Sequence, residues 1–426
     1  MANYRILRIS RVEYRSVFAE MFAAEADLAD AGFARQMQAF FDRSLVYSDS
    51  FARAMLGLGN EAIEIVCNAE RIQKTWAKEH NTSYSEADWN REIVLAQIAE
   101  WRPDVVYIQG LSSDPESFNP PADFRERFPF VKLVVAYSGS LHERDQVAGI
   151  DLLVASPPSI CRWYREAGMH AELVYHSFDP VVLDRLARHA EGPEIAFSFA
   201  GSSGLGFKDV HIDRYWELVE LALATPLRLW SYERLDRIGY RLLPEQVATL
   251  RREIDEIDGK HGAAAAVQAL RAVCRDSFGH GDPVFPLSTL FPERCHAPVF
   301  GLDMFDLLRR SRLTFNRHSD TYAVTAGNIR CFEATGVGTC MLTNDAPNLR
   351  ELFEPDSEVV VFASTEEAID KARYLLDHPA EARRIAEAGH RRTLAEHTVE
   401  RRVDQIDHLI RRALAGDAHA RLTPAA

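Results

Sequence analysis

The stretch FEATGVGTCMLTNDAPNLRELFEPDSEVVVFA, residues 332–363, alternates between helical and strand-like patterns. A helical segment at 328–335 is followed by TCMLTN at 339–344, a short and mostly apolar run. APNLRELF at 346–353 then predicts a second helix, and SEVVVFA at 357–363 predicts a second strand. Apolar strands that alternate with helices are typical of a parallel sheet covered on both faces. This part of the chain therefore predicts an α/β fold.

The same alternation continues on both sides of this stretch, except at two places. Residues 185–194 lose the periodicity and read as a linker, and residues 276–297 read as a loop. A chain of 426 residues exceeds the roughly 100–200 residues of one domain. We therefore expect two α/β domains with parallel sheets and added helices. The remaining predicted strands are at 4–10, 62–66, 104–110, 131–140, 151–156, 171–180, 195–206, 226–232 and 312–318.

The composition excludes several classes of partner. The net charge of −14 argues against nucleic acid or an anionic membrane as the main partner, since both need a clustered basic surface. No apolar run is long enough to predict a transmembrane segment, and MANYRILRIS does not have the pattern of a signal peptide. The six cysteines are scattered and form no CxxC pair, so we expect reduced thiols, no zinc site and a cytoplasmic protein.

The start of the helix near residue 328 carries the most chemistry. Gly327 allows a close approach to the backbone, and a helix N-terminus favours phosphate. Asn328 and Arg330 add hydrogen-bond donors, and Glu333 lies one turn further on the same face. A carboxylate suits the two hydroxyls of a ribose. The segment predicts a nucleotide site, although Arg330 and Glu333 could also form only an ion pair within the helix.

The order of these segments resembles the C-terminal signature of glycosyltransferases of the GT-B fold. The resemblance rests on FEATGVGTCMLTNDAPNLRELF, on NIRCFEA before it and on HTVERRV near the C-terminus. It is strongest over 298–402, and it also includes PDVVYIQG and FSFAGS. The branch that this chain resembles most is the one named after spore-maturation (CgeB-like) proteins, within the large group 1, family 4-like enzymes.

The resemblance implies two Rossmann-like parallel-sheet domains that face a cleft. Residues 1–187 would form the acceptor side and residues 188–397 the nucleotide-sugar side. Residues 398–415 would form a helix that crosses back to the first domain, and 416–426 a frayed tail. By the same resemblance Glu333 would bind the ribose, while the diphosphate, base and remaining donor contacts would come from Gly201, Ser202, Lys208, Arg214, Tyr232, Phe300, Gly301, Gly327, Asn328 and Arg330. Thr325 stands where many retaining members carry a first glutamate.

The implied reaction moves a sugar, of hexosyl type, from a nucleotide-diphosphate sugar such as a UDP-sugar to a hydroxyl. The acceptor stays open between a glycan, a protein and a small molecule, and the oligomeric state is not predicted. The sequence has no Asp-x-Asp motif, so we expect no metal and no cofactor beyond the donor substrate. Arg330 and basic side chains would stabilise the leaving diphosphate. His142 and His318, which follow predicted strands, are candidate catalytic residues.

Two alternatives use the same fold. A nucleotide-sugar epimerase would need one bound sugar nucleotide and no acceptor. A non-catalytic protein would bind a sugar nucleotide or glycan without transfer. The long segments at 12–90 and 233–297 favour transfer, because they add surface for an acceptor. A Rossmann dehydrogenase is disfavoured, since no G-x-G-x-x-G follows the first strand.

Overall fold

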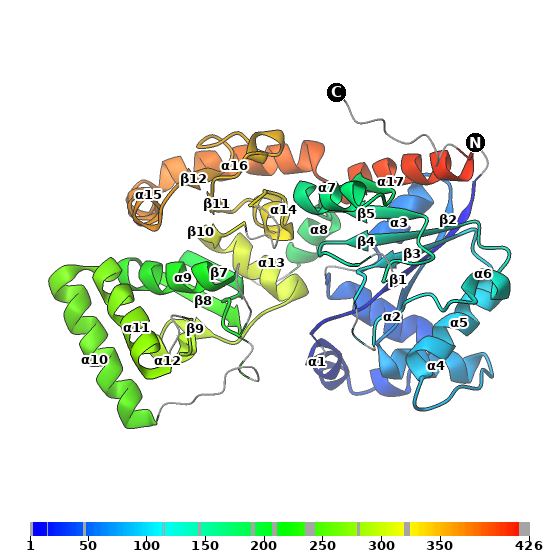
Figure 1. Cartoon of the computed structure of the whole chain (residues 1–426), viewed down its shortest axis with the longest axis horizontal. Coiled ribbons are helices and arrows are strands. Elements are labelled where there is room, and N and C mark those ends of the chain that lie inside the picture. Colours follow the sequence, from blue (N-terminus) through cyan, green and yellow to red (C-terminus); the bar gives the residue numbers. More distant parts are fainter. Residues whose placement is uncertain are drawn as a thin grey trace. The chain divides into compact units, whose positions relative to one another are not determined.

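The computed structural model describes residues 3–14, 16–45, 48–112, 114, 116–143, 146–188, 192–206, 211–233, 235, 243–278, 282–318 and 324–416. The chain divides into two compact units (Figure 1). Unit 1 is Met1–Asp179 with His397–Ala426, and unit 2 is Pro180–Glu396. Each unit is built on one parallel sheet of six strands.

Unit 1 contains a sheet in the order β2-β1-β3-β4-β5-β6, with all neighbouring strands parallel. Its strands are β1 (Arg5–Ser10), β2 (Glu61–Val66), β3 (Val105–Gln109), β4 (Leu133–Ser138), β5 (Leu152–Ala155) and β6 (Ala171–Leu173). Its helices are α1 (Ser16–Ala24), η1 (Leu28–Asp30), α2 (Phe33–Asp42), α3 (Ser50–Gly57), α4 (Glu70–Glu79), α5 (Trp89–Trp101), α6 (Phe124–Arg127), α7 (Pro158–Glu166) and α17 (Val399–Leu414).

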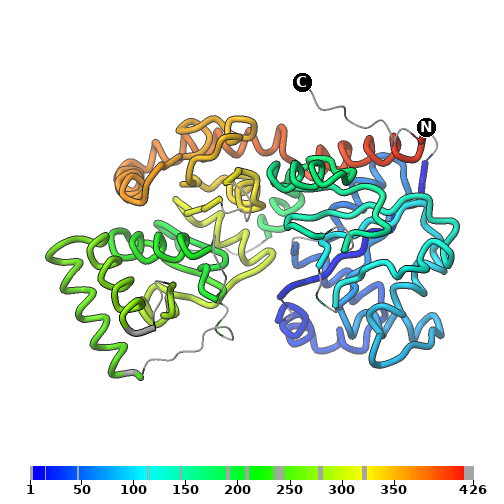
Figure 2. Tube along the Cα trace, viewed as in Figure 1, coloured from blue at the N-terminus to red at the C-terminus, as the bar shows by residue number. Residues whose placement is uncertain are grey.

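Both faces of the unit 1 sheet are covered, which explains why its central strands β3 and β4 are mostly apolar. Along β3, Val106 and Ile108 pack into one hydrophobic cluster, and Val105 and Tyr107 pack into another. Helix α17 covers the second face together with α3, although the two helices lie far apart in the sequence (Figure 2). Unit 1 is therefore completed by the last helix of the chain.

Unit 2 contains a parallel sheet in the order β12-β11-β10-β7-β8-β9. Its strands are β7 (Ile195–Ser202), β8 (Leu227–Tyr232), β9 (Cys295–His296), β10 (Ser311–Asn316), β11 (Cys340–Asn344) and β12 (Val360–Phe362). Its helices are α8 (Val181–Leu186), α9 (Ile212–Ala224), α10 (Pro244–His261), α11 (Ala263–Phe278), α12 (Leu287–Leu290), α13 (Gly301–Arg309), α14 (Ile329–Gly336), η4 (Leu349–Glu351), α15 (Thr365–Asp377) and α16 (Pro379–Glu396).

The boundaries between the units differ from those that the sequence predicts. Helix α8 was expected in the first domain, but it packs on α13, and Arg309 Nη1 donates to the Leu186 carbonyl at 3.4 Å. His397 was expected in the second domain, but its carbonyl accepts from the Phe178 N–H at 2.9 Å. Packing and hydrogen bonding therefore place the divisions at Pro180 and His397.

Two predicted elements also differ. The expected loop at 276–297 contains α12 and the two-residue strand β9, which pairs with β8 and forms one edge of the sheet. The expected helix at 346–353 is only the short 3₁₀ turn η4. In the part of the chain that the structure describes, no helix is both long and apolar enough to cross a membrane.

Candidate active site

The order of strands in unit 2 defines a topological switch point on its sheet. From β7 the chain adds β8 and β9 on one side, and β10, β11 and β12 then extend the sheet on the other. In open parallel sheets, ligands bind outside the carboxyl ends of the strands at such a switch point. Here it lies between β7, which ends at Ser202, and β10, which ends at Asn316. The residues after these two strands are therefore the first candidates for a site.

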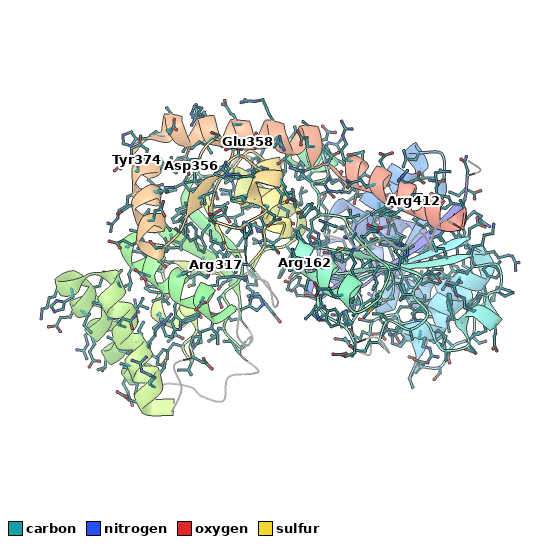
Figure 3. All side chains as sticks on the ribbon, turned by 45° about the horizontal axis from the view of Figure 1, so that its top comes forward. Arg162, Arg317, Asp356, Glu358, Tyr374 and Arg412 are labelled. Atoms are coloured by element: carbon teal, nitrogen blue, oxygen red, sulfur yellow. The ribbon has the colours of Figure 1, made fainter. Side chains whose placement is uncertain are left out.

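Two arginines and a glutamate gather at this edge, and we call Arg214, Glu217 and Arg317 the switch-point cluster. Arg317, which is labelled in Figure 3, directly follows β10. Its Nη1 lies 2.7 Å from Glu217 Oε1 on α9. Arg214, one turn earlier on α9, donates from Nη1 to the Ser202 carbonyl at 3.1 Å. The other carboxylate oxygen, Glu217 Oε2, is buried and makes no hydrogen bond within the described residues.

The charges of this cluster are perturbed by burial. Burial and the neighbouring charge of Arg317 lower the pKa of Arg214 to about 10. Burial raises the pKa of Glu217 to about 7, against the opposing effect of Arg317. Two guanidinium groups and one carboxylate leave positive charge at the edge, so the cluster favours an anion. Sequence reasoning named Arg214 but missed Arg317 and Glu217.

A second group of residues lies at the start of α14. Gly327 has a φ of 127°, a backbone conformation that favours glycine, and Asn328 is the N-cap residue before Ile329. Arg330 and Glu333 follow on the helix, and Arg330 Nη1 lies 2.9 Å from Glu333 Oε2. Because the first turn of a helix presents N–H groups with no partner inside the helix, this start suits a phosphate.

Glu333 is the most unusual side chain of the site. It is only 3% exposed, and burial raises its pKa while Arg330 lowers it. Although Arg330 is close enough for an ion pair, its Nη1 donates towards Met304 Sδ on α13. Glu333 Oε2 is held by this ion pair and makes no hydrogen bond within the described part of the chain. A carboxylate oxygen has more than one lone pair, so Glu333 Oε2 can accept a hydrogen bond from a ligand hydroxyl in addition to its ion pair.

Three consecutive residues after β10 connect the two groups. Asn316 Oδ1 accepts from Asn328 Nδ2 at 2.7 Å, and Arg317 pairs with Glu217. His318 contacts Asn328 Oδ1 through Nδ1 at 3.2 Å and Thr343 Oγ1 through Nε2 at 3.1 Å. The switch-point cluster and the start of α14 therefore form one continuous region at the carboxyl edge of the sheet.

These contacts change the interpretation of two predicted residues. His318 is 1% exposed, and burial lowers its pKa to about 4, so the ring is neutral with both nitrogens in contact with neighbours. This arrangement fits a structural role better than the catalytic role expected from the sequence. The Asn328 side chain likewise donates from Nδ2 to Asn316 Oδ1, so it orders the loop.

The predicted contacts to the base and donor lie beside this region. Tyr232, the last residue of β8, pairs in register with Ser202, and Gly201 precedes Ser202 on β7. Phe300 and Gly301 lie at the start of α13, the helix that carries Met304. The structure therefore brings these residues to the same edge of the sheet or to a helix that packs on α14.

Three other residues named from the sequence lie outside the contacts described above or outside the described residues. Lys208 lies outside the described residues. Thr325 precedes Ala326, whose N–H donates to Asn348 Oδ1 at 2.8 Å. His142 belongs to unit 1 and lies on the loop after β4. Among the described residues, no three His, Cys, Asp or Glu side chains come together as a metal site.

A family model matches part of the chain. The model of the family described as glycosyl transferase-like matches residues 265–408, which include Arg317, Arg330 and Glu333. A search of curated proteins finds none that matches the chain.

Solved structures resemble the whole chain at low sequence identity. A sucrose-phosphate synthase from Thermosynechococcus elongatus aligns with a TM-score of 0.52 and 11% identity, over 97% of this chain and 100% of that one. A glycosyltransferase from Rickettsia africae gives 0.53 and 10%, over 97% and 99%. HepE from Anabaena, solved with UDP-glucose, gives 0.52 and 11%, over 96% and 100%. The fold is thus the GT-B fold of two parallel-sheet domains, as the sequence predicts.

Proposed function

We propose that the protein transfers a hexosyl group from a nucleotide-diphosphate sugar, with UDP as the nucleotide, to an acceptor hydroxyl. The observation that carries the proposal is Glu333, a buried carboxylate whose Oε2 forms an ion pair with Arg330 but makes no hydrogen bond among the described residues. The match to the glycosyl transferase-like family over 265–408 supports it. So does the likeness in fold to HepE, which was solved with UDP-glucose.

Each group of the site has a part in this reaction. Glu333 accepts hydrogen bonds from the ribose hydroxyls, which complete its buried oxygen. Arg330, Arg214 and Arg317 lie around the sheet edge where the diphosphate binds. Glycosyl transfer passes through an oxocarbenium-like state while negative charge develops on the leaving diphosphate. Fixed guanidinium groups and the start of α14 stabilise that charge as it develops.

We also propose that the reaction needs no divalent metal, because arginines supply the positive charge at the diphosphate. Family resemblance favours retention of the anomeric configuration and membership of the spore-maturation branch. His142 is proposed as the base that accepts the proton of the acceptor hydroxyl. A cytoplasmic location is supported by the six cysteines, which are all free thiols in the structure.

The test is UDP titration calorimetry together with UDP release from UDP-glucose, both in the presence of EDTA. The wild type should bind UDP and slowly hydrolyse the donor. Glu333→Ala should weaken UDP binding roughly tenfold, because a lost buried hydrogen bond costs about 1–3 kcal/mol. The matched control is Glu387→Ala, an exposed carboxylate on α16 of the same unit.

The outcomes separate the alternatives. UDP binding without any turnover of a sugar donor would support a binding protein instead of a transferase. Activity that appears only after Mg²⁺ or Mn²⁺ is added would contradict the metal-independent mechanism. If UDP and the other common nucleotides fail to bind, the donor site does not exist, and Arg330 and Glu333 form only an ion pair.

A further inference from the structure

The switch-point cluster contains a carboxylate, Glu217, beside the proposed diphosphate site. Its Oε1 lies 2.7 Å from Arg317 Nη1, and Arg214 lies one turn earlier on the same helix. Like charges that lie close together repel each other, so a carboxylate in this place weakens the binding of an anion. A negative side chain beside a site for a negative ligand therefore needs an explanation.

The contacts of Glu217 differ from those of a carboxylate that only stabilises the fold. Asp306 on α13 is such a carboxylate, because its Oδ1 accepts from Arg309 Nη2 at 2.7 Å and its Oδ2 accepts from Arg310 Nε at 2.8 Å. Burial raises the pKa of Asp306, but the two arginines lower it more, and the net shift is downward. In Glu217 one oxygen, Oε2, is buried and makes no hydrogen bond within the described residues. Glu217 is therefore held less firmly than a structural ion pair.

The surroundings of Glu217 keep it close to a change of protonation. The charged side chains of this part of unit 2 are Arg317 after β10, His211, Asp213, Arg214 and Glu220 on or at the start of α9, Arg271 on α11 and Glu366 on α15. Burial raises the pKa of Glu217 to about 7, and among these side chains Arg317 opposes the rise most strongly. A bound anion adds a negative charge and raises this pKa further. Binding of a diphosphate near neutral pH therefore favours the protonated carboxyl group.

A carboxylate in this place distinguishes the sugar donor from the nucleotide product. In a UDP-sugar the terminal phosphate is bonded to the sugar, so it cannot lose a second proton. In UDP the terminal phosphate is free, and it loses its second proton with a pKa of about 6, as other phosphomonoesters do. UDP therefore carries more negative charge at neutral pH than the donor from which it forms. A negative side chain repels the product more strongly than the donor.

We propose that Glu217 is a counter-charge that promotes release of the nucleotide diphosphate after transfer. In the empty site its carboxylate pairs with Arg317 and offsets the charge of the two arginines. The diphosphate replaces it as the partner of Arg317, and the carboxyl group takes up a proton from solvent. Loss of this proton restores the carboxylate, which repels the product and pairs with Arg317 again. The inference rests on the proposed function, because it concerns how the product leaves that same site.

Isothermal titration calorimetry of Glu217→Gln tests the charge separately from the contact, because Gln keeps an oxygen that accepts from Arg317. The variant should bind UDP about tenfold more tightly than the wild type, with a smaller gain for UDP-glucose.

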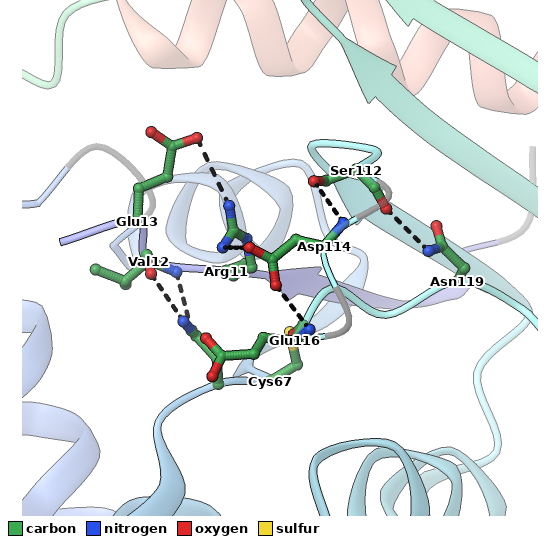
Figure 4. A network of polar contacts seen from close by, with 9 residues as sticks. Arg11, Val12, Glu13, Cys67, Ser112, Asp114, Glu116 and Asn119 are labelled. Carbon is green, nitrogen blue, oxygen red and sulfur yellow. Dashed lines mark hydrogen bonds and ion pairs between the residues drawn. The ribbon is translucent and has the colours of Figure 1, made fainter. Parts of the chain in front are cut away.

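The matched control is Glu13→Gln, which also removes a carboxylate from an arginine at the carboxyl end of a strand. Arg11 follows β1, and its Nη2 lies 3.8 Å from Glu13 Oε1 (Figure 4). Asp114 Oδ2, at 3.1 Å from Arg11 Nη1, remains as a partner of Arg11 in this variant. The control should bind UDP with the affinity of the wild type.

Proton uptake is a readout that a merely structural role of Glu217 would not change. UDP-glucose has no group that titrates near neutral pH, so its heats of binding in PIPES and in imidazole buffer report the protons that the protein takes up. At about pH 7 the wild type should take up about half a proton, since a group with a pKa of about 7 is half protonated before binding. Glu217→Gln should take up much less. The affinity of the wild type for UDP-glucose should fall as the pH rises through about 7, and this fall should disappear in the variant.

The outcomes separate this inference from the proposed function. Unchanged or weaker UDP binding by Glu217→Gln would overturn the inference, and so would equal proton uptake by the variant and the wild type. If circular dichroism shows that the variant does not fold, proton uptake by the wild type supports the inference and its absence overturns it. If the wild type binds neither UDP nor UDP-glucose, the proposed function itself fails, and this inference fails with it.

Discussion

At the scale of single residues, the positive edge of unit 2 depends on a pair that is distant in sequence. Arg317 on the loop after β10 and Glu217 on α9 meet only because β7 and β10 are neighbours in the sheet. Arg330 and Glu333 are three residues apart on one helix, so their contact could be predicted from the sequence. The order of strands, which no local pattern encodes, is why Arg317 was missed.

Replacement of Arg317 tests its part in stabilising the diphosphate. Arg317→Ala should lower kcat/KM for the sugar donor about 100-fold, since loss of one fixed donor to a developing charge costs about this much. Arg312→Ala is the control, because Arg312 lies near the other end of the same strand and pairs with the exposed Glu194. Steady-state kinetics check this, and equal effects of the two variants would contradict a role in the site.

His142 predicts a particular pH dependence. Its net pKa shift is downward, and the groups around its ring are the Leu111 backbone and Ser140 Oγ, at 3.2 Å from Nε2. A base works in its neutral form, so transfer should stay constant above pH 6.5 and fall only as the pH drops through the lowered pKa. His142→Gln should lower kcat by about 100-fold or more and remove this acidic limb. If the fall in rate at low pH persists in His142→Gln, another titrating group causes it.

At the scale of elements, the buried strands were the easiest to predict. All residues of β4 are buried, so its sequence is a continuous apolar run. The segment at 346–353 was harder, because its helical spacing competes with a distant contact. The Asn348 side chain accepts from the Ala326 N–H and donates to the Ala326 carbonyl, at 2.8 and 3.0 Å. These hydrogen bonds accompany the short turn η4 and join residues that are 22 positions apart. No periodic pattern in the sequence predicts such a contact.

The attachment of α17 to unit 1 depends on one buried carboxylate. Asp407 accepts from Tyr4 Oη at 2.8 Å, from Asn60 Nδ2 at 2.9 Å and from Arg411 Nε at 2.7 Å. Asp407→Ala should lower the free energy of unfolding by about 3 kcal/mol, because it leaves Arg411 without its charge partner and two donors without an acceptor. The control is Asp404→Ala on the exposed side of α17. Chemical denaturation measures the difference, and equal stabilities would rule out this anchoring role.

At the scale of the whole molecule, the two units differ in which parts of the chain form them. Unit 2 is one continuous segment, whereas unit 1 needs residues from both ends of the chain. In unit 1, Val403, Ile406 and Ile410 of α17 pack in the cluster that covers one face of the sheet. The proposed donor site lies within unit 2.

This difference predicts how fragments behave. Residues 180–396 should fold alone, unfold cooperatively and bind UDP, because they contain a complete sheet and the proposed donor site. Residues 1–179 should unfold at much lower denaturant concentration unless a 397–416 peptide is added, since one face of their sheet would be exposed to water. Circular dichroism during denaturation checks both fragments. A stable 1–179 fragment would contradict the structural part assigned to α17.

The most direct test of the central claim is hydrogen–deuterium exchange of the full chain with and without UDP. The claim is that a sugar nucleotide binds at the carboxyl edge of the second sheet. It predicts slower exchange in peptides that cover 202–206, 211–218 and 324–334, with little change in unit 1. Protection confined to unit 1, or none in these three segments at saturating UDP, would contradict the account.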